Sequence, residues 1–261
     1  MHYVRTGSGT PPLVFVHGFA CSHEDWLLQI NPLKSKFEIV ACDLRGHGQT
    51  PGRPQECTIE NFGGDVAALL AVLDLEKAIL IGHSMGCRVV LQAAQLAPER
   101  VAGIVLIDGS RTGSGEPDAA EAAARAALDR AGYPAFAENL FRQMFFTPSA
   151  LADAIVARAL RQSAGFGPML WPAMARWDAA KMDAALAAVR APVLVIQSTT
   201  RNAELRRSML KAGDSSPYLD MLRQGLKKAR IEVVPGVGHF TMLEAAERVN
   251  RLISEFAAAG R

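Results

Sequence analysis

Ser84 is the residue whose surroundings most clearly predict chemistry in this chain. It lies in the pentapeptide 82–86 (GHSMG), after the apolar run 78–81 and before a helical pattern that ends at Pro98. A strand that reverses sharply into a helix crowds the backbone, and glycines on both sides of the serine relieve that crowding. The pattern therefore predicts an exposed serine at a strand–turn–helix corner, where its hydroxyl can act as a nucleophile.

A serine nucleophile needs a base, because its hydroxyl keeps its proton near neutral pH. His239 is the candidate for this base. It lies 155 residues after Ser84 and follows the last apolar run of the chain. The preceding Gly238 leaves room for the imidazole to approach the serine. The two residues together predict attack on a carbonyl carbon, with proton transfer to the histidine.

Short apolar runs alternate with amphipathic segments over much of the chain. This alternation is typical of an α/β fold, in which helices cover both faces of a mainly parallel sheet. The runs that predict strands are 2–5, 13–16, 37–42, 78–81, 101–107, 192–196 and 231–234. Helices are predicted over 24–33, after Thr58, after Ser84 and at the C-terminus, where apolar residues form one stripe.

The alternation stops between residues 111 and 190. This segment is rich in alanine and helical in pattern, and glycines and prolines interrupt it. We interpret 111–190 as an inserted helical cap, and 1–110 together with 191–261 as the core domain.

The cap also contains many aromatic and sulfur-bearing side chains. They suit a substrate pocket for a medium-sized apolar group, although such residues more often pack a cap onto its core. We expect Phe145, Trp171 and Met174 of the cap, with Phe240 beside His239, to line this pocket. Arg201, Arg206 and Arg207 offer positive charge for recognition, but such charges are more typical of a solvated helix face.

The composition is that of a soluble globular protein. With 261 residues, 49% of them apolar and 21% charged, the chain can bury a full core. Its net charge of +2 comes from interspersed residues without a basic stripe, so we expect no nucleic-acid partner. The N-terminal residues lack a signal-like apolar region, and no apolar run is long enough to span a bilayer. We therefore expect a cytoplasmic protein that does not associate with membranes.

The four cysteines, Cys21, Cys42, Cys57 and Cys87, are scattered without C-x-x-C spacing. This distribution is typical of reduced thiols that act as small apolar residues. We expect no metal site from them.

Four motifs occur along the chain in a fixed order: HGF at 17–19, DLRGHG at 43–48, GHSMG at 82–86 and GVGHF at 236–240. Together they resemble the α/β-hydrolase superfamily, and within it serine esterases and lactonases. The resemblance covers nearly the whole chain and implies a catalytic triad that needs neither a cofactor nor a metal. It also implies an oxyanion hole formed by the backbone N–H groups of Phe19 and Met85. His17 and His47 match structural loop positions of the family.

The triad acid is less clearly marked than the other two residues. Many relatives carry it after the strand equivalent to 193–196, but here that strand runs into QSTTRN, which contains no carboxylate. Some relatives carry it one strand earlier, where this chain has Asp108, 24 residues after Ser84. We favour Asp108 as the residue that orients His239. Glu204, Asp214 and Asp220 are the alternatives.

The resemblance implies a serine hydrolase that cleaves carboxylic esters with short or medium apolar acyl groups through an acyl-enzyme. A lactonase, including one for acyl-homoserine lactones, is the nearest alternative, because a lactone is a cyclic ester. A carbon–carbon bond hydrolase is a third possibility. Outside catalysis, a receptor-like protein of this fold would bind a ligand without turning it over. The expected partner is a small ester or lactone, and the expected assembly is a monomer or homodimer.

Overall fold

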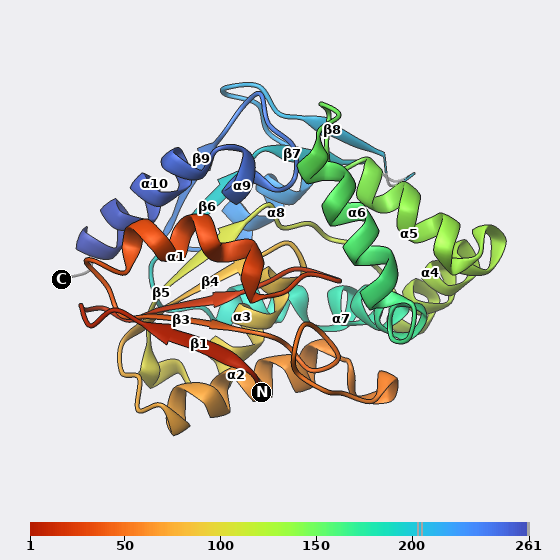
Figure 1. Ribbon diagram of the computed structural model, residues 1–261. Coiled ribbons are helices and arrows are strands. Elements are labelled where there is room, and N and C mark those ends of the chain that lie inside the picture. Colours follow the sequence, from red (N-terminus) through yellow and green to blue (C-terminus); the bar gives the residue numbers. More distant parts are fainter. Residues whose placement is uncertain (203, 205, 260–261) are drawn as a thin grey trace.

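A computed structural model describes residues 1–202, 204 and 206–259 of the chain. In this part of the chain, seven strands form one twisted sheet in the order β1-β3-β2-β4-β5-β6-β9 (Figure 1). Their bounds are β1 (Tyr3–Thr6), β2 (Leu13–Val16), β3 (Ile39–Cys42), β4 (Ala78–His83), β5 (Val101–Ile107), β6 (Val193–Gln197) and β9 (Ala229–Val233). All neighbouring strands are parallel except β1 and β3, which pair antiparallel. The predicted α/β fold class is confirmed.

The central strands are apolar along their whole length because helices cover both faces of the sheet. Phe15 of β2 pairs with Ala41 of β3 on one side and with Ile81 of β4 on the other. All three side chains are fully buried. A fully buried side chain the size of isoleucine or phenylalanine stabilises the fold by about 1.5–3 kcal/mol, so these strands form a rigid base for the loops that follow them.

Helices lie on both faces of the sheet. Figure 1 shows α1 and α10 on one face, and α2 and α3 on the other. The Thr58 hydroxyl accepts the N–H of Asn61 and caps α2 as predicted, a contribution of about 1 kcal/mol. The bounds are α1 (Leu27–Leu33), α2 (Ile59–Val72), α3 (Met85–Leu96), α8 (Pro217–Gly225), α9 (Thr241–Glu244) and α10 (Ala246–Ala259), with 3₁₀ turns η1 (His23–Trp26), η2 (Pro54–Glu56) and η3 (Pro98–Arg100). None of the helices in the described residues is both long and apolar enough to cross a membrane.

The segment between β5 and β6 is helical and extends away from the sheet (Figure 1). It comprises α4 (Pro117–Ala131), α5 (Tyr133–Arg142), α6 (Ala150–Ser163) and α7 (Gly167–Ala188). An ion pair joins it to the core: Arg88 of α3 donates to Asp178 of α7 at 2.7 Å, and both side chains are buried. These helices fall within the interval 111–190, which we propose acts as the cap.

A short hairpin that the sequence analysis did not anticipate follows β6. Its strands are β7 (Thr199–Arg201) and β8 (Arg207–Met209), paired antiparallel. The residues are polar, so neither strand shows the apolar pattern by which the sheet strands were predicted. The hairpin places Arg201 and Arg207 beside the carboxyl ends of β5 and β6. The arginines therefore lie on strands, and not on the solvated helix face that was the more typical expectation for them.

Candidate functional site

Ser84 stands at the corner between β4 and α3. Its backbone has φ 53° and ψ −111°. Residues other than glycine rarely adopt this conformation, which costs about 1–3 kcal/mol. The flanking glycines permit this corner, since a Cβ on Gly82 would lie 2.4 Å from the carbonyl oxygen of Gly86. A Cβ on Gly86 would lie 2.3 Å from the carbonyl oxygen of Val16. The serine side chain stays partly exposed at the carboxyl edge of the sheet.

His239 approaches Ser84 from the loop between β9 and α9. Its Nε2 lies 2.8 Å from the Ser84 Oγ, and its backbone N–H donates to the carbonyl of Met144 at 2.8 Å. The side chain is fully buried and packs against the ring of His83. Burial, and after it the positive charge of Arg207, lower the pKa of His239 well below its ordinary value. The two residues that the sequence analysis chose as nucleophile and base therefore lie within hydrogen-bonding distance.

The other ring nitrogen of His239 faces Arg207 of β8. The Nη1 of Arg207 donates to Nδ1 of His239 at 2.9 Å and to the Thr199 hydroxyl at 2.8 Å. A guanidinium can only donate, so Nδ1 accepts and the imidazole proton resides on Nε2. In this arrangement Nε2 donates to Ser84 instead of accepting its proton. This contact was not predicted from the sequence, because Arg207 belongs to no motif.

Asp108 follows β5 and is fully buried next to this pair. Its carboxylate accepts the N–H of Ser198 at 2.9 Å and the hydroxyls of Ser198 and Thr241. Burial raises the pKa of Asp108, while the hydrogen bonds from Thr241 and Ser198 lower it. Among the described residues, no hydrogen bond joins Asp108 to His239. Asp108 and Arg207 nevertheless interact electrostatically, because each shifts the pKa of the other toward its charged form.

The alternative acids lie elsewhere. Glu204, Asp214 and Asp220 are all exposed. Asp214 accepts the backbone N–H of Lys211, and Asp220 pairs with Arg223 on the surface of α8. In the described structure none of the three hydrogen-bonds to His239.

The backbone N–H groups of Phe19 and Met85 are the expected donors of the oxyanion hole. Phe19 is in the loop after β2, and Met85 is the first residue of α3, where the helix dipole favours negative charge. Neither N–H donates to a protein acceptor in the part of the chain that the structure describes. Both donors are therefore available to an oxyanion.

The expected pocket residues divide into two groups. Trp171 lies edge-on to Phe19, with ring centroids 6.0 Å apart, and the guanidinium of Arg201 lies 5.7 Å from its ring centroid. Phe145 stacks on Phe240 at 5.1 Å, and Phe240 is fully buried against His83. The structure thus brings Trp171 next to the Phe19 loop and places the Phe145–Phe240 pair behind His239.

Met174, the remaining expected pocket residue, is buried on α7. It lies on the helix whose Asp178 pairs with Arg88 of the core. Its place in the structure fits packing between α7 and the core.

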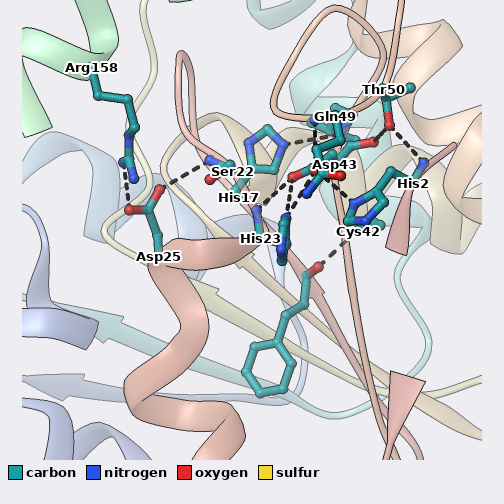
Figure 2. A network of polar contacts seen from close by, with 12 residues as sticks. His2, His17, Ser22, His23, Asp25, Cys42, Asp43, Gln49, Thr50 and Arg158 are labelled. Atoms are coloured by element: carbon teal, nitrogen blue, oxygen red, sulfur yellow. Dashed lines mark hydrogen bonds and ion pairs between the residues drawn. The ribbon is translucent and has the colours of Figure 1, made fainter. Parts of the chain in front are cut away.

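The loops that carry Phe19 and the DLRGHG motif are held together by Asp43. Figure 2 shows the rings of His2 and His23 converging on its carboxylate. This carboxylate also accepts the backbone N–H of His23 at 2.7 Å and that of Gln49 at 3.0 Å. Nearby, the Nε2 of His17 accepts the backbone N–H of Leu44 at 3.0 Å. The network fixes the loop that presents the Phe19 N–H.

The same residues form a group that could hold a metal ion. The ring nitrogens of His2 and His23 and a carboxylate oxygen of Asp43 lie within 4.8 Å of one another. Asp43 already accepts hydrogen bonds from both rings and from two backbone N–H groups. Its lone pairs are therefore satisfied by protein donors, and we assign the group a structural role.

A model of the alpha/beta hydrolase family matches residues 13–252. The chain belongs to this family. The order of the sheet, the strained Ser84 corner and its contact with His239 agree with that membership.

Two relatives show how far the similarity extends in sequence. The dihydrolipoyllysine-residue acetyltransferase component of the acetoin cleaving system of Pseudomonas putida is 31% identical over 258 residues, which cover 96% of this chain and 64% of the relative. The component of the same description from Cupriavidus necator is 37% identical over 107 residues, which cover 41% of this chain and 29% of that protein. The chain therefore spans less than two thirds of either relative.

Solved structures are similar over nearly the whole chain. A thermophilic esterase from Thermogutta terrifontis, in a malate-bound structure, superposes with a TM-score of 0.79 at 25% identity and covers 99% of this chain and 93% of its own. Est816, described as an N-acyl homoserine lactone degrading enzyme, has a TM-score of 0.73 at 24% identity and covers 98% and 96% of the two chains. The similarity to Est816 shows a common fold.

Proposed function

We propose that this protein hydrolyses carboxylic esters through an acyl-enzyme formed on Ser84. The observation that carries the proposal is the 2.8 Å distance between the Ser84 Oγ and the Nε2 of His239 at a strained strand–helix corner. A nucleophile and a base at this distance can transfer a proton during attack on a carbonyl carbon. The similarity to the Thermogutta terrifontis esterase supports the same reaction.

In the proposed reaction, Nε2 of His239 takes the proton of Ser84 as its Oγ attacks the ester carbonyl. The backbone N–H groups of Phe19 and Met85 then hold the oxyanion of the tetrahedral intermediate. When the intermediate collapses, His239 gives the proton to the leaving alcohol. A water molecule, activated by the same nitrogen, attacks the acyl-enzyme, releases the acid and regenerates Ser84.

This cycle requires the imidazole proton to reside on Nδ1, so that Nε2 is free to accept. A carboxylate facing Nδ1 would favour that tautomer and stabilise the imidazolium that forms. Asp108 is our choice, because it is buried beside Ser198 and Thr241 and interacts electrostatically with the same guanidinium that touches Nδ1. For Asp108 to take this role, Arg207 must leave Nδ1.

The proposed substrate carries a small or medium-sized apolar group. Trp171 and Phe19 are buried aromatic residues in contact at the oxyanion loop, and they provide an apolar surface there. Lactones fit the same mechanism as cyclic esters, so they belong among the substrates to be tested. We also propose that the helices α4 to α7 act as the cap over this site.

The test is the initial rate of hydrolysis for p-nitrophenyl esters of increasing acyl length and for several lactones. We expect ester hydrolysis that falls by about three orders of magnitude or more in Ser84→Ala. The exposed Ser8→Ala variant is the matched control and should keep the wild-type rate. Hydrolysis that survives in Ser84→Ala would contradict the assignment of Ser84 as the nucleophile. No hydrolysis of any ester or lactone would contradict the proposal and favour a ligand-binding protein.

A further inference from the structure

A cavity of about 190 Å³ is lined in part by Arg207, the residue whose guanidinium contacts Nδ1 of His239. The end of β6, the β7–β8 hairpin and α8 form its walls, and Arg201, Arg207 and Tyr218 are among the residues that line it. Ser84 contacts the opposite nitrogen, Nε2. Arg207 therefore connects this cavity to the ring nitrogen of His239 that faces away from Ser84.

The cavity is lined by positive charge that lacks a partner. Among the described residues, neither Arg201 nor Arg207 forms an ion pair with a carboxylate, whereas Arg88 pairs with Asp178 and Arg111 pairs with Asp183. Arg201 donates only to neutral groups, the carbonyl of Arg111 and the Thr112 hydroxyl at 2.9 Å. Both side chains are half-buried. A guanidinium that is partly removed from water is costly without a partner, so this pair calls for an anion.

Burial lowers the pKa of both Arg201 and Arg207. It lowers the pKa of Arg201 to about 9, with the charge of Arg207 acting in the same direction. It lowers the pKa of Arg207 to about 10, against the opposing influence of Asp108. Both side chains remain protonated at neutral pH. Asp108 is the buried carboxylate that acts on Arg207, and Asp178, the carboxylate that acts on Arg201, is already paired with Arg88. A single further negative charge would therefore balance the two arginines.

An unpartnered polar atom also faces this region. The Oε1 of Gln197, a residue that lines the cavity, is buried without a partner, while its Nε2 donates to the carbonyl groups of Gly109 and Thr199. Buried polar atoms are normally satisfied, so this oxygen leaves room for a polar ligand that can donate a hydrogen bond.

We propose that this cavity binds a small molecule through a carboxylate held by Arg201 and Arg207, and that this ligand draws Arg207 away from Nδ1 of His239. A planar guanidinium binds a carboxylate through two parallel hydrogen bonds, and a carboxylate supplies the single negative charge that balances the site. A phosphate dianion would exceed that balance. The second half of the proposal rests on the proposed function.

The consequence for His239 follows from its hydrogen bonds. While Arg207 donates to Nδ1, the imidazole proton stays on Nε2 and faces Ser84. Once the guanidinium turns to the ligand, Nδ1 can carry the proton and donate to Asp108. Nε2 then accepts the Ser84 proton, so an acidic ligand in this cavity activates the nucleophile on the other side of the ring.

The first test measures binding of propionate, a monocarboxylate, to the whole protein by calorimetry, with inorganic phosphate and neutral propionamide as comparison probes. We expect propionate to bind more tightly than either comparison probe. Arg201→Gln should weaken propionate binding about tenfold or more, because it removes a charge-assisted hydrogen bond. The exposed neighbour Arg206→Gln is the control and should bind as the wild type does. No binding of propionate, or tighter binding of phosphate, overturns the proposal.

The second test asks whether the ligand changes His239. Nitrogen-15 NMR of the histidine side chains reports which ring nitrogen carries the proton, and it needs no turnover. Propionate should move the proton of His239 from Nε2 to Nδ1 and increase the hydrolysis of a neutral p-nitrophenyl ester several-fold. Bound propionate that leaves the His239 spectrum unchanged overturns the second half of the proposal.

The two proposals fail separately. If no ester is hydrolysed, the proposed function falls, yet calorimetry and NMR still decide the carboxylate site. If ester hydrolysis depends on Ser84 but propionate does not bind, the carboxylate site falls and the proposed function stands.

Discussion

Arg207 donates a hydrogen bond to Nδ1 of His239 across 2.9 Å, on the side of the ring that faces away from Ser84. A serine hydrolase of the kind proposed here needs a carboxylate at this position, because the imidazole becomes positively charged when it takes the serine proton. A guanidinium does the reverse and disfavours that charge. The relationship between these two residues therefore controls how strong a base His239 can be.

The pH dependence of hydrolysis should report this relationship. The base acts when it is unprotonated, so the rate is lost as pH falls through the pKa of His239, which burial and Arg207 hold well below its ordinary value of 6.5. Arg207→Gln removes the positive charge and should raise that pKa. The acidic limb of kcat/KM should then move to higher pH, while Arg206→Gln should leave it in place. An acidic limb that is unchanged in Arg207→Gln would show that the guanidinium does not act on the base.

The assignment of the acid can be tested by comparing three carboxylates. Asp108→Asn should lower kcat about a hundredfold or more, because an amide cannot stabilise the imidazolium. Asp214→Asn and Glu204→Gln alter exposed groups and should leave kcat unchanged. Thermal unfolding of each variant separates a catalytic loss from a folding defect, since Asp108 also binds Ser198 and Thr241. A normal kcat in Asp108→Asn would move the acid elsewhere.

The strain at Ser84 predicts a difference between two substitutions that both remove the hydroxyl. Ser84→Gly should be more stable than Ser84→Ala by about 1 kcal/mol, because glycine adopts φ 53° without a Cβ penalty. Urea unfolding of the two variants gives this difference directly. Equal stabilities would indicate that the corner relaxes when the serine is removed.

The sheet and the nucleophile were predictable because both depend on local patterns. Apolar runs mark buried strands, and the glycines around Ser84 mark a corner that crowds the backbone. The strand predicted at 101–107 is β5, with the same bounds in the structure. The position of His239 followed from its place after the last strand.

The contacts made by Arg207 could not be read from the sequence. They depend on β7 and β8, strands of three residues each whose polar composition resembles a surface loop. Asp108 was chosen because it follows a strand, yet its actual partners come from the turn between β6 and β7 and from α9, far along the chain. Such pairings depend on how the loops fold over the sheet edge, which local periodicity does not encode.

The ion pair between Arg88 of α3 and Asp178 of α7 should be important for attaching the helical segment 111–190 to the core. The two side chains are 3% and 0% exposed, and the backbone N–H of Thr112 also donates to Asp178. Asp178→Asn leaves Arg88 as a buried, unpaired charge and should lower the free energy of unfolding by about 3–5 kcal/mol.

A double variant distinguishes the unpaired charge from a simple loss of packing. Arg88→Met combined with Asp178→Asn removes both charges, while the asparagine still accepts the N–H of Thr112, so most of the stability should return. The control is the exposed pair Arg230 and Glu232, where Glu232→Gln should cost less than about 1 kcal/mol. Urea unfolding of the wild type, the two single variants and the double variant gives the coupling free energy between Arg88 and Asp178. A double variant as unstable as Asp178→Asn alone would show that the loss does not come from the uncompensated guanidinium.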